Sequence, residues 1–503
     1  MKTGSEAKTA AGELTGIIVG EFEKLCAIPH GSGHEKALSD YLKSRLASCS
    51  SRIEQDAAGN LLAELPACPS GTQGPVVILQ AHMDMVVAVS APAVGTNPTV
   101  LPVLEGSVLH SDGRTSLGAD NGIGVAVILA LSCRSVFVHG PLRVLFTVSE
   151  ETGLRGAALL PPRWLAGADF LINTDGFHAD TEVIGCKSGC RETFAKELRP
   201  EPAPPRSRAF SLSLSGFSGG HSGDDIDKGR CNTVQTLARL LSDAEKELPG
   251  LRLAAFSGGI GFNVIPGDST AAVLVPAEDA QRFPEWIENR GAALLGEFQD
   301  RGKLSAAACA SPAQCWPRAF QEEVLTFLTE LKNGVWERKN GEVSSSCNIG
   351  RVVQQGMSLL VQVMLRCDTV GQDQQMMAQH RQAAENGGFT CEISGYHSWH
   401  AVPDSLLART VQCAYEETTG RKMTQKTAKV GLETAFFQQK APSLQMVCLG
   451  AEIRRAHSVG ESVDIDSAAL LFRVMQKTLT ALCAGTGEKE RRQPPEPKNA
   501  AGA

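Results

Sequence analysis

Histidine and carboxylate side chains recur at widely separated places in this 503-residue sequence, and most of them directly follow an expected strand. No cysteine accompanies them. Imidazole and carboxylate together are typical ligands of a hydrolytic zinc or manganese pair, whereas structural zinc sites usually include cysteine. The sequence therefore indicates a metal-dependent hydrolytic centre. The candidate ligands are His82, Asp120, Glu150, Glu151, Asp175 and His457.

The elements expected around these residues explain how they could meet. Apolar and β-branched runs at 76–79, 143–148, 170–173 and 444–449 predict strands, and residues 121–131 predict a buried helix. Strands that alternate with helices predict an α/β fold with a mostly parallel sheet covered on both faces. Because such sheets bind ligands at the carboxyl ends of their strands, we expect the candidate ligands at one edge.

The acidic candidates allow alternative interpretations. Asp120 directly precedes the expected helix, so by itself it would be interpreted as a helix cap. Beside the other ligands, we favour a carboxylate that bridges two metal ions. Glu150 and Glu151 leave a strand in different directions, so one can bind metal while the other acts as a general base. The alternative is a pair of solvated surface glutamates.

Two further positions have a proposed function on sequence grounds. Asp84 lies two residues after His82 and is suited to orient its imidazole. His221 lies in the glycine-rich turn SGFSGGHSGDDI, where the backbone can approach another group closely. The other histidines have no comparable neighbours, so we expect them at the surface or in satisfied polar contacts. These are His30, His34, His110, His139, His178, His380, His397 and His400.

Composition restricts the class of protein. The length implies two or more domains, and 42% hydrophobic with 20% charged residues is typical of a globular protein. A net charge of -7 without a dense basic stripe argues against nucleic-acid binding. The sequence shows neither a signal-peptide core nor an apolar run of about 18 residues, so we expect no membrane association. The 15 scattered cysteines indicate reduced thiols and a cytoplasmic location.

The middle of the chain predicts a separate domain. Residues 201–208, EPAPPRSR, form a proline-rich break that we interpret as a domain crossing. Two similar stretches follow, each containing a strand and flanked by an amphipathic helix, at 233–248 and 320–331. This repetition predicts two βαββαβ units. Beyond Cys483 the chain is polar and proline-rich, which predicts a disordered tail.

The motifs resemble those of the co-catalytic zinc peptidases, the family that contains carnosinase, aminoacylase and the glutamate carboxypeptidases. The resemblance extends over residues 22–482. In the family's order the chain carries IPHGSGHE, QAHMDMV, LGADNGIGVA, TVSEETGLRGA, NTDG, KSGC, GGHSGDDI and AHSVGE. Around these motifs the chain departs from the family pattern, for example with GLETAFF. These departures concern substrate preference and remove no ligand.

The resemblance implies two divalent metal ions, with Zn²⁺ favoured over Mn²⁺ or Co²⁺. His82 and Asp175 would bind one ion, and Glu151 and His457 the other. Asp120 would bridge the two ions, and the peptide bond between Asp120 and Asn121 would be cis. Glu150 would be the catalytic base, and Asp84 would support His82.

The resemblance also implies the domain organisation. Residues 1–188 and 397–484 would form the catalytic α/β domain, and residues 189–396 a lid and dimerisation domain of two ferredoxin-like units. Residues 485–503 would remain as the tail. His221, Asn263 and Arg366 would contact substrate from the lid. Arg366 could clamp a free carboxylate, because a guanidinium fork fits it bidentately; a structural ion pair is the alternative.

The implied activity is that of a metal-dependent dipeptidase that hydrolyses unblocked dipeptides, of the Xaa-His type and others. Its partner would be the small dipeptide substrate, and a homodimer is expected. Two alternatives stay open: an N-acyl amino acid hydrolase that uses the same site, and a non-catalytic metal-binding member of the family.

Overall fold

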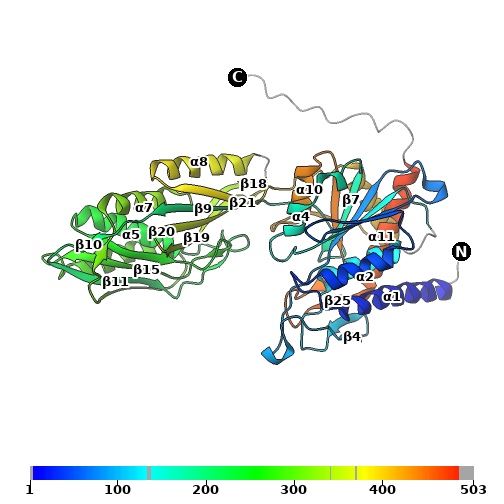
Figure 1. Cartoon of the computed structure of the whole chain (residues 1–503), viewed down its shortest axis with the longest axis horizontal. Helices are drawn as coiled ribbons and strands as arrows, with labels where there is room; N and C mark the ends of the chain where they lie inside the picture. Colours follow the sequence, from blue (N-terminus) through cyan, green and yellow to red (C-terminus); the bar gives the residue numbers. More distant parts are fainter. Residues whose placement is uncertain (1–3, 133–136, 340, 369–370, 486–503) are drawn as a thin grey trace, which may run out of the picture. The chain divides into compact units, whose positions relative to one another are not determined.

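The computed structural model describes residues 4–132, 137–339, 341–368 and 371–485, which form two compact units (Figure 1). The first unit comprises Met1–Cys186, Trp399–Ala428 and Leu432–Ala503, and the second comprises Lys187–Ser398 and Lys429–Gly431. These divisions lie within two residues of the boundaries expected at 188 and 397. The expected tail at 485–503 lies, except for Gly485, outside the described residues.

An eight-stranded sheet forms the centre of the first unit, in the order β1-β2-β6-β3-β7-β23-β8-β22. The four middle strands β6, β3, β7 and β23 are parallel. On one side β2 is antiparallel to β6, and on the other β8 is antiparallel to β23 but parallel to the edge strand β22. The sheet is therefore mixed, with four parallel strands at its centre and a further parallel pair at one edge. The strands are β1 Arg52–Gln55, β2 Leu61–Leu65, β3 Val77–His82, β6 Leu142–Thr147, β7 Phe170–Gly176, β8 Thr181–Cys186, β22 Thr424–Ala428 and β23 Gln445–Gly450.

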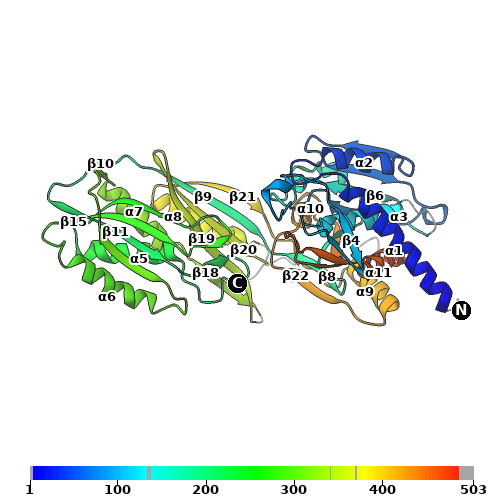
Figure 2. The same ribbon diagram turned by 90° about the horizontal axis from the view of Figure 1, so that it is seen from below.

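Helices cover both faces of this sheet (Figures 1 and 2). Val77, Leu79 and Ala81 of β3 belong to a core shared with α1, α2, α3, α9 and α11. The side chain of Gln80 points to the opposite face, where it donates to Glu433 at the start of α10. The helices are α1 Gly4–Cys26, α2 Lys36–Leu46, α3 Ala119–Ser132, α4 Arg155–Leu159, α9 Leu406–Thr419, α10 Thr434–Lys440 and α11 Ile465–Ala484.

The helix α3 is buried along its whole length, as its continuous apolar sequence predicts. Gly124 in its first turns permits the close approach to β7, because a Cβ atom there would collide with the side chains of Asn121 and Thr174. A small sheet completes the unit. Its strands, in spatial order, are β24 Glu452–Arg454, β25 Ser462–Asp464, β5 Val108–Ser111 and β4 Pro102–Glu105.

The second unit contains two βαββαβ units, as predicted. One runs β11-α5-β13-β15-α6-β16, and the other runs β9-α7-β19-β20-α8-β21. Each has the strand order 4-1-3-2, and β13 pairs with β19 to join them into one nine-stranded antiparallel sheet. The strands are β9 Gly189–Glu197, β11 Ser207–Ser215, β13 Arg252–Gly258, β15 Ser269–Pro276, β16 Lys303–Ala308, β18 Gly334–Lys339, β19 Glu342–Gln355, β20 Ser358–Cys367 and β21 Thr390–Tyr396.

The helices of the second unit pack against one face of its sheet (Figure 1). Phe210, Leu212 and Leu214, alternate residues of β11, belong to the core that these helices close. The helices are α5 Thr233–Glu247, α6 Phe283–Leu295, α7 Arg318–Glu330 and α8 Gln372–Asn386, and the short strands are β10 Glu201–Pro202, β12 Gly220–His221, β14 Val264–Ile265 and β17 Gln314–Cys315.

The proline-rich break at 201–208 does not connect the two compact units. It lies within the second unit and leads from β9 of one βαββαβ unit to β11 of the other. The break marks the insertion of one βαββαβ unit into a loop of the other, so the expected domain crossing at this position is wrong. None of the described helices is long and apolar enough to cross a membrane.

Candidate metal centre

The ends of the four parallel strands bring the candidate ligands together in the first unit. His82 ends β3, and Asp175 is the second-last residue of β7. Glu150 and Glu151 follow β6, and His457 follows β24, the short strand of the small sheet that comes directly after β23. Asp120 joins them from the first turn of α3.

The ligand-type atoms of this site form three groups of three, of which two share Asp120 and the third joins His82 to Glu150 and Glu151. In one of the two groups that share Asp120, His82 Nε2 lies 3.1 Å from Asp120 Oδ1 and 3.5 Å from Asp175 Oδ1. In the other, His457 Nε2 lies 3.0 Å from Asp120 Oδ2 and 2.9 Å from Glu151 Oε1. Ligands bound tetrahedrally to one zinc ion lie about 3.3 Å from each other. Each of these two groups therefore has the spacing of a single metal site.

Asp120 has the geometry of a bridging ligand. Its two carboxylate oxygens face different imidazoles, and among the described residues neither accepts a capping hydrogen bond from α3. The Asp120–Asn121 peptide is cis, as the resemblance implies, and both residues have non-helical torsion angles. The arrangement thus favours the bridge over the helix cap.

The donor set fits divalent cations. Four carboxylates, of Asp120, Asp175, Glu150 and Glu151, gather in the site, and within the described parts of the chain no lysine or arginine forms an ion pair with them. Glu151 Oε1 is buried and makes no hydrogen bond although His457 Nε2 is 2.9 Å away. These two atoms are arranged as neighbouring ligands rather than as donor and acceptor. Buried carboxylates need positive charge beside them, which bound divalent cations would supply.

The electrostatics of the site reflect this crowding of carboxylates. Burial, with the negative charge of Asp120, raises the pKa of Asp175 to about 7. The hydrogen bond to Asp120, together with the adjacent carboxylate of Glu151, raises the pKa of His457 to about 10. Burial acts to raise the pKa of Asp120, but hydrogen bonds from His457 and His82 outweigh it and lower that pKa. Protons therefore occupy positions that cations would take.

Glu150 and Asp84 have different surroundings from the ligands. Burial raises the pKa of Glu150 well above its usual value. The Asp84 carboxylate accepts hydrogen bonds from the backbone N–H groups of Glu150 at 2.9 Å and Glu151 at 3.2 Å, and from the Ser32 hydroxyl. His82 Nδ1 lies 3.6 Å from that carboxylate but 2.9 Å from the backbone carbonyl of Asp84. Asp84 thus holds the glutamate loop as well as flanking the imidazole.

Three buried glutamates that the sequence analysis gave no role hold the site together. Glu35 accepts from the backbone N–H and hydroxyl of Ser149, directly before Glu150. Glu461 accepts from the backbone N–H groups of Leu117, Gly118 and Asp120. Glu433 accepts hydrogen bonds from the side chains of Gln80 in β3 and Thr147 at the end of β6. Glu35 and Glu461 belong to the quoted motifs IPHGSGHE and AHSVGE, which were the only signal for them.

Two ligand loops contain residues with left-handed backbone torsions. Ser149 has φ 52° and His457 has φ 61°. Such conformations cost about 1–3 kcal/mol in residues other than glycine and persist only where the surroundings impose them. The hydrogen bonds from Ser149 to Glu35 are one such constraint.

The structure also brings His221, Asn263 and Arg366 of the second unit together. They meet around Ser222, whose backbone N–H donates to the Asn263 carbonyl and whose hydroxyl accepts from Arg366 Nε at 3.4 Å. Arg366 is buried, and within the described residues no carboxylate forms an ion pair with it. The alternative of a structural ion pair is therefore not supported.

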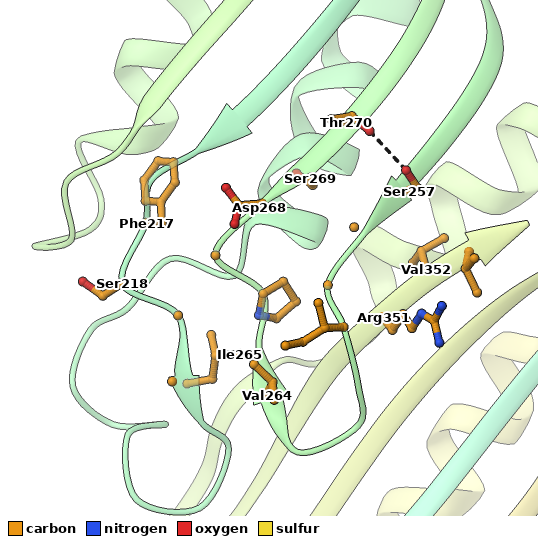
Figure 3. A pocket seen from close by; sticks show the side chains of 18 residues that line it. Phe217, Ser218, Ser257, Val264, Ile265, Asp268, Ser269, Thr270, Arg351 and Val352 are labelled. Atoms are coloured by element: carbon orange, nitrogen blue, oxygen red, sulfur yellow. Dashed lines mark hydrogen bonds between the residues drawn. The ribbon is translucent and has the colours of Figure 1, made fainter. Parts of the chain in front are cut away.

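A cavity of about 460 Å³ lies beside the His221 turn in the second unit (Figure 3). Glycine, small and apolar residues line most of it. Its only ionisable lining residues are Asp268 and Arg351, which Figure 3 shows on different sides. None of the candidate ligands lines this cavity, so the cavity contributes no metal ligand and no acid–base pair to the candidate metal centre.

The remaining histidines mostly have the structural roles expected. His380, for example, is buried and hydrogen-bonds to Glu192 at 2.6 Å. His397 differs from the expectation, because it has ligand-type neighbours in Asp373 and Cys190. The three residues are distant in sequence, which concealed their proximity.

Comparison with known proteins agrees with this arrangement. The model of Peptidase family M20/M25/M40 matches residues 78–481. The cytosol non-specific dipeptidase of Escherichia coli (strain K12) is 31% identical over 472 residues, which cover 92% of this chain and 97% of the relative. The crystal structure of aminoacylhistidine dipeptidase from Vibrio alginolyticus is also 31% identical, with a TM-score of 0.79 and coverage of 92% of this chain and 96% of that one.

A more distant structure, a tripeptidase from Staphylococcus aureus subsp. aureus mu50, shares the fold. It is 16% identical, with a TM-score of 0.56 and coverage of 93% of this chain and 99% of that one. The family resemblance expected from the motifs is confirmed. This chain belongs to Peptidase family M20/M25/M40.

Proposed function

We propose that this chain is a dinuclear metallodipeptidase that hydrolyses short, unblocked dipeptides, including those of the Xaa-His type. The observation that carries the proposal is the pair of ligand groups joined by Asp120. The relatives from Escherichia coli and Vibrio alginolyticus, named as dipeptidases, support the substrate class.

His82, Asp120 and Asp175 would hold one cation, and Asp120, Glu151 and His457 the other. Zn²⁺ suits a set of imidazole and carboxylate donors, and Mn²⁺ and Co²⁺ are the alternatives that the experiment below compares with it. When bound, such ions supply Lewis-acid activation of water and of the scissile carbonyl.

Glu150 would move the proton. Its carboxylate takes a proton from the attacking water and delivers it to the leaving amide nitrogen, which departs as a free amine. The low polarity that raises the pKa of Glu150 favours holding the proton between these two steps. Asp84 keeps Glu150 in place through the backbone of its loop.

The cluster around Ser222 would recognise the substrate. A buried guanidinium without a carboxylate partner in the described structure is costly, and the free carboxylate of a dipeptide would satisfy Arg366. The backbone N–H groups of Gly223 and Asp224 donate to His221 Nδ1. This leaves Nε2 to donate to the scissile carbonyl as negative charge develops on it. We propose that Asn263 contributes a further polar contact.

Two alternatives differ in measurable ways. An N-acyl amino acid hydrolase would use the same metals and Arg366 but would prefer a blocked amine. A non-catalytic family member would bind metal without turnover. The presence of Glu150 beside a complete ligand set favours catalysis over that second alternative.

A substrate panel tests the proposal. Metal-stripped protein is assayed with carnosine, Ala-His, Cys-Gly, Leu-Gly, a tripeptide and an N-acetyl amino acid, after addition of Zn²⁺, Mn²⁺ or Co²⁺. Metal-dependent cleavage of the free dipeptides is expected. Cleavage of the acetylated compound alone would assign the chain to the deacylases, and metal binding without cleavage would favour the non-catalytic alternative.

We further propose a cytoplasmic location and a homodimer. The free cysteines of the described chain are consistent with a reducing compartment. The edge strands β16 and β21 of the second unit offer unpaired backbone groups through which two copies could pair. Sedimentation equilibrium of the full chain distinguishes a dimer from a monomer.

A further inference from the structure

A second cluster of ligand-type side chains lies in the second unit and shares no residue with the candidate metal centre. Cys190, Asp373 and His397 have ligand atoms that all lie within 4.8 Å of one another. Asp373 Oδ2 is the shared atom: it contacts His397 Nδ1 and lies 4.0 Å from Cys190 Sγ.

Three different elements of one βαββαβ unit supply these residues. Cys190 is the second residue of β9, Asp373 is in the first turn of α8, and His397 directly follows β21. Cys190 and Asp373 are 3% and 2% exposed, whereas the His397 side chain is 47% exposed. The cluster therefore has two buried donors and one side that is accessible to an ion.

The arrangement differs from a nucleophilic triad. In a triad the thiol faces the imidazole, and the carboxylate lies beyond it. Here one carboxylate oxygen, Asp373 Oδ2, contacts His397 Nδ1 and also lies 4.0 Å from Cys190 Sγ, so the carboxylate does not lie beyond the imidazole. A simple ion pair would account for Asp373 and His397, and the hydrogen bond that Cys190 Sγ donates to the Tyr396 carbonyl at 3.5 Å would account for the thiol. Neither contact explains why all three ligand-type atoms lie within 4.8 Å of one another. Thiolate, imidazole and carboxylate directed at a common point are a zinc donor set.

We propose that Cys190, Asp373 and His397 bind a further divalent cation of borderline softness, Zn²⁺ or its substitute Co²⁺, independently of the centre in the first unit. The ion would connect the starts of β9 and α8 to the end of β21. It would therefore stabilise the second unit without taking part in hydrolysis.

Ion binding at this cluster must displace protons. Burial, with the nearby charge of Asp373, raises the pKa of the Cys190 thiol. The hydrogen bond with Asp373 raises the pKa of His397. Both groups bind metal only when deprotonated, so binding would weaken as the pH falls.

Cobalt spectroscopy of the full chain tests the proposal selectively. The centre in the first unit contains no thiol ligand, so a thiolate-to-cobalt charge-transfer absorption would report a cysteine site alone. We expect this absorption when Co²⁺ is added to the metal-stripped protein, together with one more equivalent of bound metal than in Cys190→Ser. Cys309→Ser, which removes an exposed thiol, is the matched control and should behave like the unmodified chain.

His397→Gln provides a second variant whose side chain is half-exposed and whose loss should leave the core intact. It should weaken cobalt binding at this cluster at least tenfold while dipeptide turnover stays unchanged. Equal metal content in Cys190→Ser and the unmodified chain, or a charge-transfer absorption that persists in Cys190→Ser, would overturn the proposal. These readouts do not depend on the proposed peptidase activity.

Discussion

The two clusters of ligand-type residues are assembled in different ways by the two sheets. In the first unit, the parallel strands β3, β6 and β7 end at one edge and bring His82, Glu151 and Asp175 together, and the loop after β24 adds His457. In the second unit, Cys190, Asp373 and His397 come from the starts and ends of antiparallel strands and a helix. Parallel topology concentrates polar residues at a predictable edge, whereas an antiparallel sheet offers no such edge.

The two clusters also differ in charge. The first holds four carboxylates with two imidazoles, an excess of negative charge that divalent cations would compensate. The second pairs one carboxylate with one imidazole, so its charges already balance when His397 is protonated. We therefore expect the first cluster to retain metal more strongly than the second.

The largest expected effect separates the two clusters. Asp120→Ala removes the residue shared by both ligand groups, so the first unit should lose both metals and all measurable dipeptide turnover. The thiolate-to-cobalt absorption of the Cys190 cluster should remain. Metal analysis and near-ultraviolet spectra of the same sample check this. Two metals still bound in the first unit would contradict the bridging role.

Glu150→Gln should abolish turnover while leaving the metal content unchanged. General acid–base catalysis contributes about 10²–10⁴-fold, and a glutamine cannot accept the water proton. The measurement is kcat alongside metal per chain, with the exposed Glu105→Gln as the matched control. Loss of metal in Glu150→Gln would mean that Glu150 is a ligand.

Arg366→Lys should weaken recognition of the free carboxylate. Hydrogen bonds to charged groups contribute about 1.5–3 kcal/mol, which corresponds to roughly 10–100-fold in kcat/KM. Hydrolysis of the same dipeptide as its C-terminal amide should change little. Arg351→Lys, on the nearby cavity, is the control. An equal loss with the amide substrate would indicate a structural role for Arg366.

Glu461→Gln should weaken metal binding in the first unit by about 10–100-fold, the usual effect of losing a residue that orients ligands. A glutamine side chain offers one acceptor oxygen in place of two, so it cannot hold all three backbone N–H groups before Asp120. Competition with a chelator measures the affinity. Unchanged affinity would show that the turn before α3 holds its shape without Glu461.

Acidification should release metal from the first unit. In the metal-free protein the pKa of Asp175 is about 7 and that of His457 is about 10, and both residues must lose a proton to bind metal. Each proton displaced weakens binding by about tenfold per pH unit below the relevant pKa. Calorimetry in buffers of different ionisation enthalpy should show proton release on metal addition. Metal affinity that does not vary with pH would contradict these protonation states.

Much of this structure could be predicted where local pattern and topology agree. The strand ends marked the ligands, the apolar run after Asp120 marked α3, and repetition in the middle of the chain predicted two βαββαβ units. The roles of Glu461 and Glu433 could not be predicted, because their partners lie more than 280 residues away in sequence. His397 appeared isolated because its neighbours Cys190 and Asp373 belong to a different strand and to a helix, which the sequence pattern does not place together. The interpretation of the proline-rich break as a domain crossing was wrong, because composition identifies a loop but not the elements that it connects.

The most direct test of the central claim is turnover of an unblocked dipeptide as metal is returned to the stripped Cys190→Ser protein. This variant leaves only the first cluster to be filled. The account predicts that turnover rises with added metal and reaches its plateau at two equivalents per chain. Full occupancy by two metals without hydrolysis of any free dipeptide would contradict it.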